Sequence, residues 1–162
     1  MNLVIASRPR GRRINRCLLK QIIAALLADL KIESAELGVY LVGALEMTRL
    51  NEKFLRHAGP TDVITFDYVD EDRVGCPQPA AGATGTWRPA IHGEIFICVD
   101  EAVLQGRKFG TSWQSEVVRY IVHGILHLLG HDDRRPAARR KMKREENRRL
   151  RQLSRRFPLS KL

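Results

Sequence analysis

The chain has 162 residues, of which 44% are hydrophobic and 28% charged, and these proportions are ordinary for a globular domain. Its formal net charge is +10. No apolar run approaches the ~20 residues of a membrane-spanning helix. The first basic residues follow a short apolar stretch, whereas a secretory signal carries its basic residues before a longer one. These features favour a cytoplasmic protein over a membrane or secreted one, and three widely spaced cysteines without a CxxC pair argue against a disulfide framework. We expect a single cytoplasmic domain over residues 1–162.

The spacing of apolar residues predicts five elements in the first half of the chain. A short strand is predicted at residues 2–6, followed by an amphipathic helix at 14–31, whose apolar residues recur at four-residue steps. A buried strand is predicted at 38–43 and a second helix at 44–55. The segment 60–68 begins with a turn signal and continues as a β-rich run.

The middle of the chain contains most of its turn-forming residues. Glycine and proline are concentrated in residues 70–90, which predicts a long loop or a hairpin tip. The sequence GEIFICVD at 93–100 predicts another strand, and residues 99–108 predict a helix.

The last third of the chain is predicted to be helical. One helix is expected over 112–130, with Ser112 as its N-cap and Gly130 as its C-terminal stop. A basic helix with few apolar anchors is expected at about 136–156. Because strands come first and helices follow, the pattern favours an α+β fold with a single mixed sheet.

The positive charge is concentrated at the two ends of the chain. Residues 1–20 carry +6 and residues 134–162 carry +11, whereas residues 21–133 carry −7. Such basic segments attract polyanions, and arginine, which dominates here, suits phosphate. The charge therefore favours nucleic acid as the partner, with a solvated, solubilising tail as the alternative.

The sequence HGILHLLGHDD carries the strongest chemical signal. His123 and His127 are four residues apart, so both lie on one helical face and can bind one metal ion. A catalytic zinc needs a third protein ligand, and Gly130 permits the chain to turn back and supply it. Asp133 is favoured because it lies ten residues after His123, as in sites of the form H-x-x-x-H-x-x-G-x-x-H; His131 is the alternative.

The residue after the first histidine argues against a peptidase. Zinc peptidases read H-E-x-x-H and use the glutamate as general base, but position 124 is glycine. An aspartate as third ligand adds negative charge, which weakens the metal as a Lewis acid and loosens the preference for zinc over manganese.

The same run resembles the signature of the YbeY endoribonuclease family, H-G-x-L-H-L-x-G-(Y/H)-D-H. It differs only at the last position, where this chain has Asp133. The segment from Asn51 to Phe66 is similar to the family's N-x-x-(F/Y)-R-x-x-x-x-P-T-D-V-L-S-F, and GEIFIC at 93–98 is similar to its G-D-I-x-I-(C/S) strand. The resemblance covers most of residues 40–133.

This resemblance implies a zincin-like α+β fold, with a metal-binding helix near the C-terminus and one zinc held by His123, His127 and Asp133. It implies cleavage of single-stranded RNA, a role in maturing the 3′ end of small-subunit ribosomal RNA, and a role in ribosome quality control. The expected partners are single-stranded RNA, ribosomal RNA, and the small ribosomal subunit with its proteins. The family's cleft arginine maps onto Arg56, so we expect Arg56 and His123 to be catalytic.

Several assignments stay open at this point. Thr61 and Asp62 either line the cleft or satisfy the turn, and Glu94 either faces the cleft or is solvated. Asp132 is a candidate to orient a ligand histidine. The alternative function is a non-catalytic ribosome-assembly or RNA-binding factor, whose structural metal would need four protein ligands.

Overall fold

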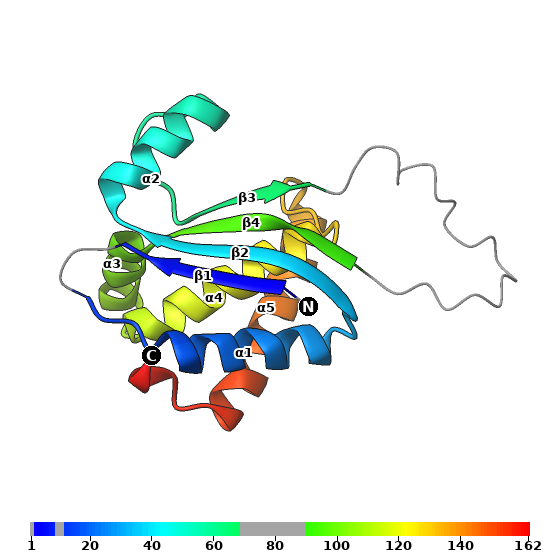
Figure 1. Cartoon of the computed structure of the whole chain (residues 1–162). Helices are drawn as coiled ribbons and strands as arrows, with labels where there is room; N and C mark the ends of the chain where they lie inside the picture. Colours follow the sequence, from blue (N-terminus) through cyan, green and yellow to red (C-terminus); the bar gives the residue numbers. More distant parts are fainter. Residues whose placement is uncertain (1, 9–11, 69–89) are drawn as a thin grey trace, which may run out of the picture.

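The computed structural model describes residues 2–8, 12–68 and 90–162 (Figure 1). These residues contain four strands: β1 (Asn2–Ser7), β2 (Ser34–Val42), β3 (Val63–Asp67) and β4 (Ala90–Cys98). They form one sheet in the order β1-β2-β4-β3, in which β3 is antiparallel to β4 and the other pairs are parallel. The mixed sheet confirms the predicted α+β fold.

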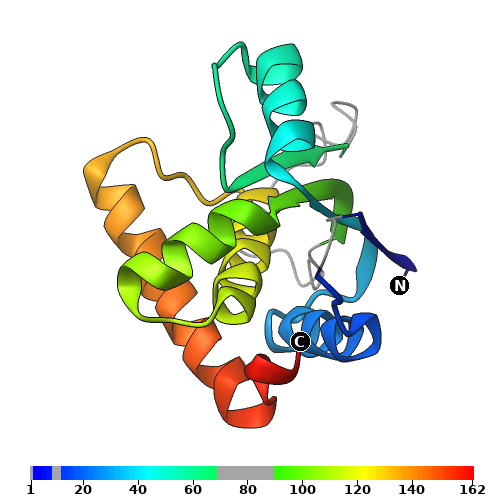
Figure 2. The same ribbon diagram turned by 90° about the vertical axis from the view of Figure 1, so that its left-hand side faces the viewer.

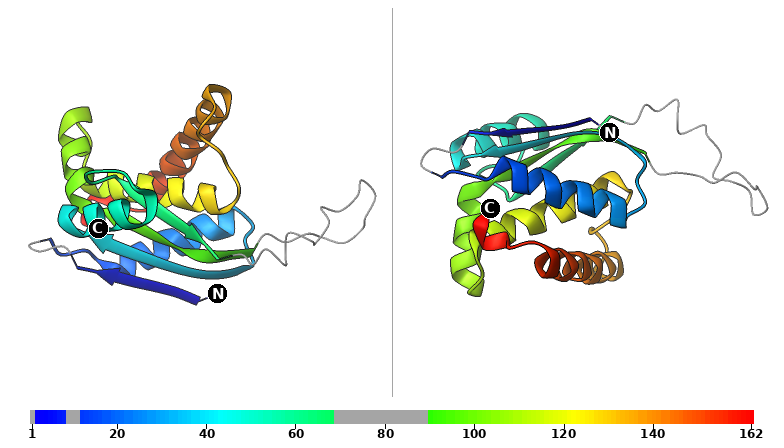
Figure 3. Two further views of the ribbon diagram at one scale, coloured as in Figure 1. Left: turned by 90° about the horizontal axis from the view of Figure 1, so that it is seen from above. Right: turned by 60° about the horizontal axis from the view of Figure 1, so that its bottom comes forward.

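The helical elements lie mainly on one face of this sheet. They are α1 (Arg16–Asp29), α2 (Ala44–Leu50), the π-helical turn η1 (Asn51–Leu55), α3 (Val99–Phe109), α4 (Trp113–Leu128), α5 (Pro136–Arg156) and the 3-10 turn η3 (Leu159–Lys161). Figure 3 shows α1 and α4 beneath the sheet, with α5 packed on the outer side of α4. No helix in the described ranges is long and apolar enough to cross a membrane.

The main core lies between the sheet and the helices α1 and α4. Alternate residues of the two central strands point into it, because side chains of a strand alternate between faces. It includes Val39 and Leu41 of β2, Ile95 and Ile97 of β4, Ile22, Ile23 and Leu26 of α1, and Ile121, Val122 and Ile125 of α4, all of them buried. This packing fixes α4 firmly against the sheet.

Gly124 lies where α4 packs closely against β4 and β3. A Cβ atom at this position would lie 2.9 Å from Cγ2 of Ile95 and 3.1 Å from Cγ2 of Thr65. The distance to Ile95 is shorter than real Cβ contacts, so a larger residue at position 124 requires Ile95 or the helix to shift. The tight packing at Gly124 thus disfavours the carboxylate that a zinc peptidase carries beside its first histidine.

Some predicted boundaries are shifted in the structure. The strand predicted at 38–43 begins at Ser34, and the strand predicted at 93–100 begins at Ala90. These two starts pair with each other in the parallel register, a non-local contact that extends both strands.

Two further differences concern helical segments. The strand prediction is wrong for the last two residues of 93–100, because Val99 begins α3. In this helix the Asp100 carboxylate accepts a hydrogen bond from the Ala44 backbone N–H at 2.7 Å. The helix predicted at 44–55 divides into α2 and η1. The loop predicted at 70–90 lies outside the described residues apart from Ala90, which belongs to β4.

The C-terminal end of the chain lies beside α1 (Figure 2). Asn15 caps α1 by accepting a hydrogen bond from the backbone N–H of Leu18 at 3.0 Å, and its own backbone N–H donates to the carbonyl of Leu162 at 3.0 Å. The helix α5 covers the range predicted for the basic helix. Cys17 and Cys98 are free thiols, and Cys76 lies outside the described residues.

Candidate metal centre

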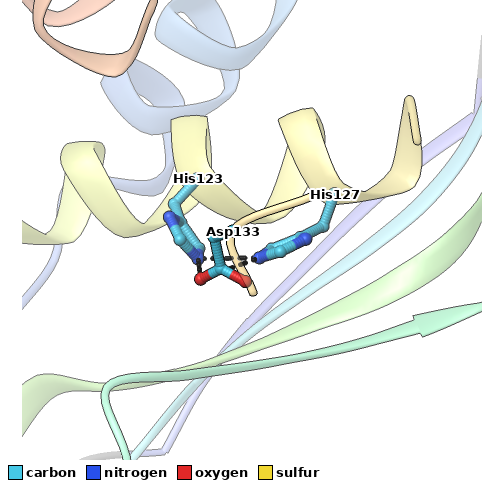
Figure 4. A group of neighbouring side chains, drawn as sticks. All are labelled: His123, His127 and Asp133. Atoms are coloured by element: carbon cyan, nitrogen blue, oxygen red, sulfur yellow. Dashed lines mark hydrogen bonds and ion pairs between the residues drawn. The ribbon is translucent and has the colours of Figure 1, made fainter. Parts of the chain in front are cut away.

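The two histidines of α4 face a common point one helical turn apart (Figure 4). Their Nε2 atoms are 2.9 Å apart. Oδ2 of Asp133 lies 4.0 Å from Nε2 of His123 and 3.8 Å from Nε2 of His127. The structure thus brings together the three residues that the sequence predicts as ligands, and this group could hold a metal ion.

A glycine turn returns the chain to the histidines after α4. Gly130 has a φ of +82°, and its N–H donates to the carbonyl of His127 at 2.8 Å. The N–H of His131 donates to the carbonyl of Leu126 at 3.0 Å. This pair of bonds is the Schellman C-cap, which ends the helix and reverses the chain direction. The turn is what carries Asp133 back to the histidine pair, as the sequence predicts.

Each histidine is fixed through the ring nitrogen that points away from the group. Nδ1 of His123 lies 2.7 Å from Oε1 of Glu146, and Nδ1 of His127 lies 3.0 Å from the backbone carbonyl of His131. Both acceptors favour the tautomer with a proton on Nδ1, so the Nε2 lone pairs are free to bind a cation. His131 thus contributes its backbone carbonyl to the site, and its side chain is not part of the group.

Glu146 is the residue of the site that the sequence analysis missed. It comes from α5, is only 4% exposed, and also lies 3.2 Å from Nζ of Lys143. The sequence did offer one signal for Glu146: Glu145 and Glu146 are the only acidic residues in the otherwise basic segment 134–162. Asp132, the predicted orienting residue, instead accepts the backbone N–H of Arg134 at 3.0 Å.

The protonation equilibria of the group favour metal binding. Burial and the neighbouring His123 lower the pKa of His127, so its imidazole stays neutral and able to ligate at lower pH. Burial alone would raise the pKa of Glu146, but the hydrogen bond with His123 and the charge of Lys143 outweigh it, and the net pKa is lowered. Glu146 is therefore ionised beside His123, where it makes the imidazole a stronger ligand.

The separations suit a single divalent ion. Zinc lies about 2.0–2.2 Å from nitrogen and oxygen ligands, so two atoms bound to one ion are at most about 4.4 Å apart. All three separations, 2.9, 3.8 and 4.0 Å, are below this limit. Three protein donors in the described part of the chain, rather than four, match an open catalytic site more closely than a closed structural one.

A pocket of about 460 Å³ opens beside this group, between α4 and α5. Its lining includes His123 and Asp133 of the group and four basic residues, Arg119, Arg139, Arg140 and Lys143. Asp62 also lines it, while its Oδ1 accepts the backbone N–H of Val63 at 2.9 Å. Asp62 therefore fills both of the roles considered from the sequence.

Two other candidate residues do not line this pocket. Arg56 ends η1 with a φ of +57°, is exposed, and is not among the residues that line the pocket. Glu94 accepts hydrogen bonds from the hydroxyls of Tyr40 and Tyr68 at 2.9 Å each. Since its neighbour Ile95 points into the core, Glu94 lies on the opposite face of the sheet from α4.

Comparison with known proteins identifies relatives along most of the chain. A family model described as "Endoribonuclease YbeY" matches residues 10–154. A protein of that name from Salinibacter ruber is 41% identical over 61% of this chain and 58% of its own length. Another from Chlorobium luteolum is 30% identical over 89% of this chain and 93% of its own. One from Geobacter metallireducens is 31% identical over 90% of this chain and 91% of its own length.

A solved structure supports the same fold. The solution structure of TM1509 from Thermotoga maritima superposes on this chain with a TM-score of 0.61 and 24% sequence identity. The superposition covers 93% of this chain and 88% of TM1509. The mixed sheet, the histidine helix and the relatives together define an enzyme of the hydrolase class, an RNA-cleaving endonuclease. The chain belongs to the endoribonuclease YbeY family, because the family model covers nearly all of it.

Proposed function

We propose that this chain is a zinc-dependent endoribonuclease that cleaves single-stranded RNA in the cytoplasm. Its RNA target is the 3′ end of small-subunit ribosomal RNA, and it takes part in ribosome quality control in contact with the small subunit and its proteins. The observation that carries the proposal is the convergence of two imidazole nitrogens and one carboxylate, contributed by His123, His127 and Asp133.

These three side chains would hold the zinc ion. Bound there, zinc would lower the pKa of a water molecule and polarise a phosphoryl oxygen. The protein's own contribution is orientation, since Glu146 holds the ring of His123 and the carbonyl of His131 holds that of His127. The carboxylate of Asp133 also makes manganese an acceptable substitute in this donor set.

Arg56 is proposed to act on the phosphate itself. Cleavage of a phosphodiester builds negative charge on its non-bridging oxygens, and a guanidinium can stabilise this charge with two parallel hydrogen bonds. Arg56 forms no ion pair with any described residue, so its guanidinium is available to a substrate. The basic ends of the chain bind further phosphates without reading the base sequence.

The test is cleavage of a single-stranded RNA by zinc-loaded protein, together with the zinc content of each variant. We expect His123→Ala to lose both zinc and activity, and Arg56→Ala to keep zinc but lose about 10²- to 10³-fold in kcat. His92→Ala, an exposed histidine outside the group, is the matched control and keeps both. Cleavage that persists in His123→Ala contradicts the proposal, and zinc and RNA binding without cleavage by the wild type supports a non-catalytic assembly factor.

A further inference from the structure

The pocket beside the metal group has an excess of basic side chains. Four cationic residues line it: Arg119, Arg139, Arg140 and Lys143. Its acidic side chains are already engaged. Asp133 belongs to the metal group, Glu146 contacts His123 and Lys143, and Asp62 accepts two hydrogen bonds in its own turn.

Two of the four cations have no carboxylate partner. Arg119 is held by Glu116 at 3.3 Å and by Asn147 at 2.7 Å, and Lys143 is held by Glu146. The Nε of Arg139 donates to a backbone carbonyl, that of Asp133 at 2.9 Å, and Arg140 makes no ion pair or hydrogen bond within the described ranges. Two guanidinium charges are therefore available to an anion in this pocket.

A buried hydroxyl provides the second, independent observation. Tyr120 lines the same pocket, is only 5% exposed, and its hydroxyl is the one buried side-chain polar atom without a hydrogen-bond partner among the described residues. Leaving such a group unsatisfied costs about 1–3 kcal/mol, so a ligand that accepts its hydrogen bond is favoured. Burial, with a smaller contribution from Asp62, raises the pKa of Tyr120 far above its ordinary value, so this hydroxyl is a donor at neutral pH.

We propose that this pocket is a second phosphate subsite, which binds the backbone phosphate adjoining the phosphodiester held at His123, His127 and Asp133. The inference rests on the proposed function, because it takes RNA as the ligand. The pocket shares His123 and Asp133 with the metal group, so the two phosphates belong to consecutive positions of one strand. A phosphate fits the donors present, since arginine forks and a neutral hydroxyl all donate to its oxygens.

The test uses short RNA fragments as competitors. Zinc-loaded protein is equilibrated with a fluorescently labelled single-stranded RNA, which is then displaced by the dinucleotide UpU, by pUpU or by UpUp. UpU offers only one phosphodiester, whereas the other two add a terminal phosphate on the 5′ or the 3′ side. We expect one of these two to compete about tenfold better than UpU. A gain of this size corresponds to one additional charge-assisted hydrogen bond. Which of them gains gives the direction of the strand in the site.

Matched variants locate the effect. Arg140→Gln and Tyr120→Phe are expected to remove most of the terminal-phosphate advantage, and Tyr120→Phe deletes only the oxygen of a buried ring. Lys141→Gln makes the same change of charge at the next residue of α5, is exposed, and lies outside the pocket lining, so it keeps the advantage. Thermal unfolding of each variant verifies that it is folded.

The outcomes separate this inference from the proposed function. No terminal-phosphate advantage in the wild type, or an advantage that survives in Arg140→Gln, overturns the subsite, even if the protein binds and cleaves RNA. Equal losses in Arg140→Gln and Lys141→Gln overturn it as well. A wild type that binds no RNA overturns both proposals, whereas one that shows the expected pattern but never cleaves RNA overturns only the proposed nuclease.

Discussion

The ring of His123 depends on a carboxylate from another helix. Glu146 lies on α5, 23 residues further along the chain, and its Oε1 is 2.7 Å from the histidine Nδ1. A carboxylate in this position fixes the tautomer of a ligand histidine and raises its basicity. Glu146 as a residue is 4% exposed, and its carboxylate stays ionised because His123 and Lys143 contact it.

Replacing this carboxylate is expected to weaken metal binding without unfolding the protein. Glu146→Gln keeps the shape of the side chain but removes its charge, so we predict a zinc Kd about 10- to 100-fold higher. Glu145→Gln is the matched control, since Glu145 pairs with Arg148 and Arg149 at 2.7 Å each rather than with a histidine. Competition titration with a zinc chelator measures both. Equal weakening in the two variants would assign the effect to the general charge of α5.

The ligand group could be predicted from the sequence because its parts are close together along the chain. His123, His127 and Asp133 lie within one helix and the turn after it, so helical periodicity and one glycine were enough to place them. Glu146 and Tyr120 could not be assigned, because their roles depend on how α5 docks against α4. The role of Arg56 stays a prediction, since it derives from the family resemblance alone.

At the scale of elements, α3 and α4 are each followed by a glycine with a positive φ, but only the glycine after α4 leads to the metal group. Gly130 follows α4 with a φ of +82° and Gly110 follows α3 with a φ of +66°. A Cβ at either position would meet nothing within 4 Å. Substitution by alanine therefore adds backbone strain and no steric clash at both sites, and only the turn at Gly130 leads to a residue of the metal group.

This pair of glycines gives a controlled test of the turn. We predict that Gly130→Ala and Gly110→Ala each lower the free energy of unfolding by about 1–2 kcal/mol, since alanine disfavours positive φ. Only Gly130→Ala should also raise the zinc Kd, because it displaces Asp133. Chemical denaturation and zinc titration of both variants measure the two effects. Unchanged zinc affinity in Gly130→Ala would argue against Asp133 as the third ligand.

The order of the elements was predictable, whereas several of their ends were not. Apolar periodicity placed α1 and α4, and Ser112 and Gly130 marked the ends of α4, where Ser112 accepts the backbone N–H of Ser115 at 3.2 Å. The first residues of β2 and β4 have no local strand signal. They are strands because Ser34 pairs with Ala90, and such register is fixed only when distant segments meet.

At the scale of the whole molecule, the basic segment that leads into α1 meets the C-terminal end of the chain. The hydrogen bond from Asn15 to Leu162 joins the start of α1 to the C-terminal turn. Arg12 lies over the ring of Trp113, 5.4 Å from its centroid, at the start of α4. The basic residues 12–20 therefore begin beside the C-terminal end of the chain, and positive charge from both segments at this junction favours the capture of a polyanion.

The basic residues at this junction should contribute to RNA binding through their charge. For single-stranded RNA, log Kd changes with log salt by about 0.7 for each phosphate contacted. We predict that the double change Arg13→Gln/Arg16→Gln weakens binding and lowers this slope by about 0.7–1.4, while kcat is unchanged. The double change Arg107→Gln/Lys108→Gln, at the end of α3, is the control. A slope that falls equally in both would indicate a response to net charge alone.

The origin of Glu146 on a separate helix also links the cation to the dynamics of the fold. Three donors come from α4 and its turn, but the residue that orients one of them arrives only when α5 is docked. By linkage, a bound cation must stabilise the docked arrangement by as much as docking strengthens its binding. Chelation would therefore lower the cost of local opening, and the backbone amides of α5 would exchange with deuterium faster even where they lie far from the histidines.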